Sequence, residues 1–139
     1  MQKFIFNGWE FPSIKAEPPV ERFLKIIMSP EVNGYKEATV LFSHIPPGSS
    51  SGRHSHTSDE IMYIATGRGE SVVGTEKQQI QTDSVVYAPR GIEHECKNTS
   101  GTETLKIFCV YIPPLKPSPL LQKLIEKTQK DMFKANAAQ

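Results

Sequence analysis

Cysteine is scarce in this chain, occurring twice among 139 residues, so a small domain stapled by several disulfides is excluded. Charge of one sign is not in excess either. Sixteen Lys and Arg against fifteen Asp and Glu give a formal net charge of +1, which argues against a nucleic-acid partner. No apolar run has the length of a membrane span, and the first residues lack the apolar segment of a signal peptide. We therefore expect a cytoplasmic protein with neither a membrane nor a nucleic-acid partner.

The chain has the length of one domain, which can bury about two thirds of its unfolded surface. Its two cysteines, Cys96 and Cys109, fall in consecutive predicted strands. With a turn centred near Ser100-Gly101, the two thiols would lie diagonally across the strand pair rather than opposite each other. We therefore expect no disulfide, and reduced thiols suit the cytosol.

Short apolar or alternating segments separated by turn residues indicate an antiparallel barrel or jelly roll. The expected strands are 22–28, 38–45, 52–56, 60–66, 69–74, 84–88, 93–98 and 104–112. Residues 1–20, with Pro12 and the Pro18-Pro19 pair, are expected to be irregular. The sequence shows no internal repeat, so we expect one barrel and not a duplicated pair.

The pattern changes to that of a helix after the last strand. Ser118 is suited to cap a helix that has Pro119 as its first residue. Apolar or small side chains then recur at helical spacing, at Leu121, Leu124, Ile125, Thr128 and Met132. These features predict an amphipathic helix over residues 117–134, with a frayed tail from Ala135. Its apolar stripe must cover either the barrel wall or a partner subunit.

Three of the four histidines and one glutamate form a pattern typical of a metal site. His54 and His56 are two residues apart, which in a strand turns both imidazoles to one face. Glu60 opens the next apolar run, and His94 follows about forty residues later, after a Pro-Arg-Gly turn. Only a closed or nearly closed sheet would bring these segments together. Three imidazoles and a carboxylate would then bind a first-row divalent metal.

The spacing of these residues resembles the two motifs of the cupin superfamily. The first motif reads Gly48-x5-His54-x-His56-x3-Glu60-x6-Gly67, and the second reads Asp83-x5-Pro89-x-Gly91-x2-His94-x3-Asn98. The second departs from the family pattern at Asp83, where glycine is usual. The resemblance implies an all-β fold: a single RmlC-like jelly-roll antiparallel β-barrel over residues 21–113. The C-terminal helix would be appended to that same domain.

The resemblance also implies a function. A small cupin of this kind would hold one divalent transition metal (Fe, Mn, Ni, Zn, Co or Cu) through His54, His56, Glu60 and His94. It would be a metalloenzyme of the dioxygenase, isomerase, decarboxylase or lyase type, acting on a small oxygenated substrate. Glu60 would be a ligand first and a catalytic base second. The alternative is a non-catalytic cupin that binds or senses a small molecule. Small cupins commonly form homodimers, so a homodimer is expected.

Three further residues have open roles at this stage. Met62 shares its strand face with Glu60, and Cys96 shares its face with His94. Each either fills the core or lines a pocket beside the metal. His44 lies outside both motifs, and we expect it in a solvated or core-edge position rather than at the site.

Overall fold

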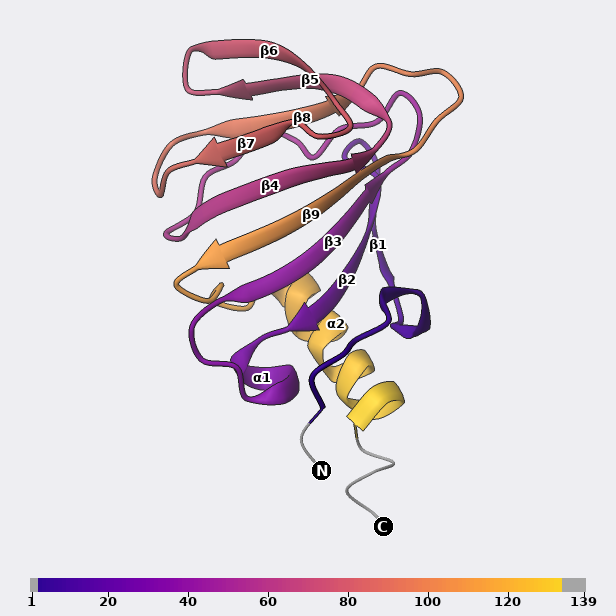
Figure 1. The fold of residues 1–139 in the computed structure, drawn as a ribbon, viewed down its shortest axis with the longest axis vertical. Coiled ribbons are helices and arrows are strands. Elements are labelled where there is room, and N and C mark those ends of the chain that lie inside the picture. Colours follow the sequence, from indigo (N-terminus) through magenta and orange to yellow (C-terminus); the bar gives the residue numbers. More distant parts are fainter. Residues whose placement is uncertain (1–2, 134–139) are drawn as a thin grey trace.

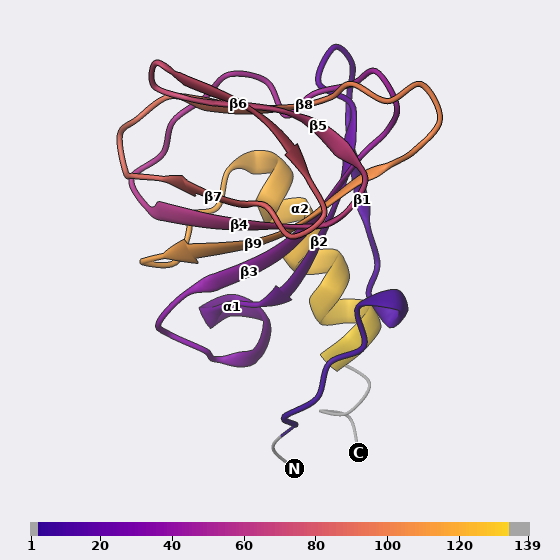
Figure 2. The same ribbon diagram turned by 45° about the horizontal axis from the view of Figure 1, so that its top comes forward.

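The computed structural model describes residues 3–133, which form two antiparallel sheets rolled into a jelly-roll barrel (Figures 1 and 2). The larger sheet has the strand order β1-β2-β3-β9-β4-β7, and the smaller sheet has the order β6-β5-β8. The strands are β1 (Ile14–Ala16), β2 (Arg22–Met28), β3 (Thr39–Ile45), β4 (Asp59–Thr66), β5 (Arg68–Val73), β6 (Glu76–Gln81), β7 (Val85–Ala88), β8 (His94–Asn98) and β9 (Leu105–Ile112). The predicted all-β cupin fold is confirmed.

All but one of the expected strands are present, with ends that differ by at most one residue. The exception is 52–56, where the prediction was wrong. Gly52 has a positive φ of 73°, which interrupts the extended backbone. In place of a strand, this segment makes isolated bridges, Ser50 with Lys97 and His54 with His94.

Two predictions need correction, one for the N-terminal segment and one for the strands that carry the cysteines. Residues 1–20 are not wholly irregular, because β1 adds to the edge of β2 and pairs Ile14 with Leu24. A 3-10 helix, Gly8–Glu10, precedes it. The two cysteine-bearing strands are not paired with each other either. Strand β8 pairs with β5, whereas β9 lies between β3 and β4 in the other sheet. Both cysteines are buried as free thiols.

The predicted helix is present as α2 (Pro119–Thr128), followed by a π-helical turn, Gln129–Phe133. As predicted, the Ser118 hydroxyl caps it by accepting a hydrogen bond from the backbone N–H of Leu121. The helix lies against β1 and β2 (Figure 2). Its stripe, formed by Leu121, Leu124, Ile125 and the Thr128 methyl, is buried in the core of its own chain. Residue 134 and the tail from Ala135 lie outside the described residues.

A short helix, α1 (Pro30–Asn33), joins β2 to β3 and has a serine cap of the same kind, Ser29. Within residues 3–133, no helix combines the length and the apolar character that crossing a membrane would need.

The motif departure at Asp83 is accommodated locally. Asp83 has a φ of 76°, in the left-handed region where glycine is favoured and aspartate is better tolerated than most residues. Its carboxylate accepts a hydrogen bond from the Tyr63 hydroxyl, and its backbone N–H bonds the carbonyl of Ile64. The turn before β7 therefore accommodates a residue other than glycine at this position.

Candidate metal centre

The four predicted ligands come from three separate parts of the barrel. Glu60 lies near the start of β4 in the larger sheet, and His94 opens β8 in the smaller one. His54 and His56 lie in the connection between β3 and β4, and the bridge from His54 to His94 ties that connection to β8. One ligand atom from each of the four residues lies within 4.8 Å of the other three. The closed sheet thus brings together what the sequence separates.

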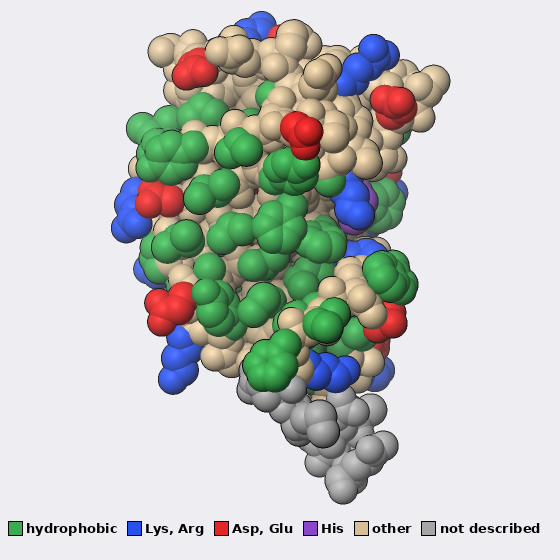
Figure 3. Space-filling view, viewed as in Figure 1, with side chains coloured by type: hydrophobic (Ala, Val, Ile, Leu, Met, Phe, Trp, Pro, Cys, Tyr) green, Lys and Arg blue, Asp and Glu red, His purple; other side chains and the backbone are tan. Residues whose placement is uncertain are grey.

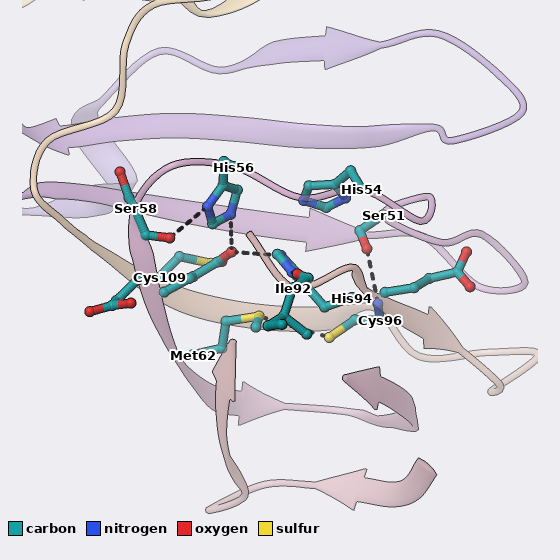
Figure 4. Close-up of polar contacts among 12 residues, drawn as sticks. Ser51, His54, His56, Ser58, Met62, Ile92, His94, Cys96 and Cys109 are labelled. Atoms are coloured by element: carbon teal, nitrogen blue, oxygen red, sulfur yellow. Dashed lines mark hydrogen bonds and ion pairs between the residues drawn. The ribbon is translucent and has the colours of Figure 1, made fainter. Parts of the chain in front are cut away.

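Each imidazole is oriented by a backbone carbonyl two residues away. The Nδ1 atoms of His54, His56 and His94 lie 2.8, 2.9 and 2.9 Å from the carbonyl oxygens of Gly52, Ser58 and Ile92. A carbonyl only accepts hydrogen bonds, so each Nδ1 carries a proton and donates it. The Nε2 atoms are thereby left for the centre of the cluster, the arrangement that usually supports metal-ligating histidines. Figure 4 shows the three rings gathered together.

Glu60 is the acceptor at the middle of this cluster. Its Oε1 atom lies 3.0 Å from His56 Nε2 and 3.1 Å from His94 Nε2, and the residue is 3% exposed. Burial alone would raise the pKa of Glu60, but the hydrogen bonds from the two histidines outweigh it and lower the pKa to about 2. The pKa of His94 is raised, because its hydrogen bond to Glu60 overcomes the effect of burial.

The four residues fit one divalent metal ion. With Nδ1 already donating to a carbonyl, His56 and His94 can both donate through Nε2 to Glu60 only if both are imidazolium ions. That arrangement places two protons around one buried carboxylate oxygen. A divalent cation carries the same charge as those two protons, and the Nε2 lone pairs and the carboxylate could coordinate it directly. Three nitrogens and one oxygen form a donor set that suits the first-row metals.

A cavity of about 270 Å³ adjoins the four ligands. Its walls are mainly apolar and include Leu24, Leu41 and Ile107, and the first turn of α2 contributes Leu120 and Leu121. The appended helix therefore forms part of the wall of the candidate site as well as covering the core.

Met62 and Cys96 line this cavity and also belong to the core, so neither of the two roles considered for them excludes the other. The Cys96 and Met62 sulfurs are 3.9 Å apart, and they lie together beneath the histidines in Figure 4. Cys109 lines the same cavity. Burial raises the pKa of Cys96 to about 11, so this wall presents a protonated thiol and not a thiolate at neutral pH.

His44 lies on the opposite face of β3 from Leu41 and Ser43, which line the cavity, and it takes no part in the site. Burial and the nearby charges of Lys106 and Lys25 lower its pKa.

Sequence reasoning missed most of the cavity lining, including two residues beside the candidate ligands. Arg22 opens β2, and the ring of Tyr111 on β9 packs edge-on against His56 with centroids 5.2 Å apart. Strand parity places both on inward faces, because Arg22 shares a face with the buried Leu24 and Tyr111 shares one with Cys109, but parity alone does not bring them to the candidate ligands.

Comparison with known proteins shows that the chain is similar to a family model, to a bacterial protein sequence and to a crystal structure. A family model described as a cupin domain matches residues 41–111. An uncharacterised protein of Streptomyces coelicolor is 34% identical over 67 residues, which is 48% of this chain and 62% of that protein. The crystal structure of a predicted oxalate decarboxylase from Thermotoga maritima is similar at 25% identity and a TM-score of 0.71, covering 79% of this chain and 99% of that one.

The fold is also shared with an RmlC-like cupin from Shewanella frigidimarina. The two chains are 10% identical with a TM-score of 0.66, covering 81% of this chain and 92% of that one.

Proposed function

The chain belongs to the cupin family, and on this premise we propose that it is a metal-dependent enzyme acting on a small oxygenated substrate. His54, His56, Glu60 and His94 would hold one divalent transition metal. The observation that carries this proposal is the support of all three Nδ1 atoms by backbone carbonyls, which leaves every Nε2 for the centre of the cluster.

The bound metal would act as a Lewis acid that polarises a substrate oxygen. Four protein ligands would leave one position open on a five-coordinate ion and two on a six-coordinate ion, whereas a purely structural site is saturated. The adjoining cavity would hold the substrate, and its apolar walls would keep bulk water away. Glu60 would be a ligand first, and it is the carboxylate in the site that could take up a proton.

The likeness to the predicted oxalate decarboxylase favours decarboxylation among the reaction types open to a cupin site, which also include those of dioxygenases, isomerases and lyases. The cavity volume of about 270 Å³, near the lower end of the range for ligand pockets, supports a small substrate.

The test is the metal content of the purified protein. We expect wild-type protein to bind close to one divalent ion per chain, measured by elemental analysis after dialysis. The double variant His54→Ala, His56→Ala should lose it, because two of the three imidazoles are gone. His44→Ala is the matched control, since it removes a histidine from the outer face of the barrel, and it should keep the full metal content.

Undiminished metal in the double variant would refute the assignment. If the metal is present, Glu60→Gln separates the two roles of that residue. It should retain some metal and lower turnover, and an unchanged rate with an active substrate would remove Glu60 from proton transfer.

A further inference from the structure

We propose that the substrate of this site is a small carboxylate anion and that Arg22 binds its carboxylate group. This inference rests on the proposed function, because it names the class of molecule that would occupy the cavity beside the metal ligands. Arg22 would be a specificity-determining residue, and its guanidinium would fix which end of the substrate faces the four ligands.

Arg22 is the first residue of β2, and this position brings it to the cavity. Its Nη1 atom donates a hydrogen bond to the backbone carbonyl of Ser51, at 3.1 Å, on the segment that leads to the ligand His54. That bond fixes the guanidinium beside the histidines.

The rest of the guanidinium lacks a partner. Its Nε atom is buried without a hydrogen bond, and Arg22 forms no ion pair among residues 3–133. Because Nη1 is used by Ser51 and Nε is inaccessible even to water, Nη2 is the guanidinium nitrogen that remains to donate a charge-assisted hydrogen bond to a carboxylate in the cavity.

The charge balance of the cavity also favours an anion. Glu60 is the only acidic residue among those that line it, whereas Arg22 lies inside and Lys116 at the solvent-exposed part of the lining. Coordination to a divalent ion would more than neutralise Glu60. The two basic side chains would then have no counter-charge from the protein, and an anionic substrate would supply one.

The size and walls of the cavity narrow the class further. A volume of about 270 Å³ with apolar surroundings suits a compact acid rather than a nucleotide or a sugar phosphate. The charged guanidinium of Arg22 would pair with one carboxylate oxygen, and a second oxygen of the same molecule would face the metal ligands.

The experiment compares two probes of nearly equal size, glycolate and glycolamide, which differ in the carboxylate charge. Each is titrated calorimetrically into zinc-loaded protein, and the ratio of the two dissociation constants is the readout. We expect wild-type protein to prefer glycolate, and Arg22→Gln to lower that preference by roughly 10- to 100-fold, the effect of losing a charge-assisted hydrogen bond. Arg22→Lys should lower it less, because the positive charge remains.

Arg68→Gln is the matched control, because Arg68 is exposed on β5 and does not line the cavity. It removes the same charge from the molecule and should keep the wild-type preference. Elemental analysis and thermal unfolding of each variant show whether zinc and the fold are retained. If Arg22→Gln fails to fold, the ratio of dissociation constants measured for Arg22→Lys tests the proposal instead.

The outcomes separate the two proposals. Failure of wild-type protein to bind zinc would overturn the proposed function. Zinc binding with no preference for glycolate in the wild type, or with the same preference in both Arg22 variants, would overturn only the role of Arg22.

Discussion

Glu60 is held as an ion inside an apolar barrel, and this has a consequence for stability in the absence of metal. Because its pKa in the folded protein is about 2, below the usual 4.5, folding favours the ionised form. The resulting stability is present above about pH 4.5 and is lost as the pH falls towards 2. By linkage it amounts to about 3 kcal/mol, taken as an order of magnitude.

We therefore expect metal-free wild-type protein to lose stability steeply below pH 4.5, and metal-free Glu60→Gln to lose less over the same range. Urea unfolding at pH 7, 4.5 and 3 would measure both. Parallel pH dependences for the two proteins would show that Glu60 is not the group responsible.

The clustering of the four candidate ligands could be predicted from the sequence because short spacing encodes most of it. His54, His56 and Glu60 lie within seven residues of one another, and the turn before His94 marks the second segment. Arg22 and Tyr111 have no such local signature. Their approach to the site depends on the register of β2 and β9, which tertiary pairing decides.

At the scale of elements, the strands that were missed are those with weak propensity of their own. Strand β6 has the sequence Glu-Lys-Gln-Gln-Ile-Gln, with Ile80 as its only buried residue. Few of its residues favour strands, and it forms because β5 offers a partner along its whole length, from Arg68 with Gln81 to Val73 with Glu76. The helix was easier to predict, because its cap and its apolar spacing are both local.

The packing of α2 predicts that helix and barrel unfold together. Leu124 is fully buried in the common core, whereas its neighbour Lys123 is exposed. Leu124→Ala should cost about 2–5 kcal/mol, because it leaves a cavity between the helix and the sheet. Lys123→Ala is the control and should change stability by less than about 0.5 kcal/mol.

Urea unfolding followed by far-UV circular dichroism, which reports mainly on the helix, and by near-UV circular dichroism of the barrel's packed aromatic rings, such as the buried Tyr111, would test this. We expect one coincident transition that shifts as a whole in Leu124→Ala. A helix signal lost before the barrel signal would mean that α2 is an independent attachment.

At the scale of the whole molecule, one face of the larger sheet remains apolar and exposed. Figure 3 shows apolar side chains gathered over β4, β7 and β9. This outer face is formed by Ile61, Tyr63, Val85, Tyr87, Phe108 and Ile112, which are 38–65% exposed. Several are cross-strand partners, such as Ile61 with Tyr87 and Tyr63 with Phe108, so the face is continuous. The stripe of α2, in contrast, is already buried in its own chain and is not available to a partner.

We propose that the outer face pairs with the same face of a second copy to form a homodimer. None of its six side chains is charged, so it offers nothing to a partner selected by charge, whereas two such faces match each other across a two-fold axis. Tyr87→Glu should give a monomer, because it would bury two carboxylates at the interface without partners. Tyr87 is 55% exposed, so the change should leave the fold and the metal site intact.

Light scattering after size-exclusion chromatography would measure the mass of each protein. Trp9→Glu is the control, since Trp9 is 79% exposed but lies in the 3-10 helix before β1, outside the strands that form the face. It should remain dimeric and keep its metal, as should the wild type. A wild type that is monomeric at all concentrations would overturn the proposed dimer. A Tyr87→Glu protein that stays dimeric would show that the dimer interface lies elsewhere. All four candidate ligands come from one chain, so dissociation by Tyr87→Glu should leave the metal content unchanged.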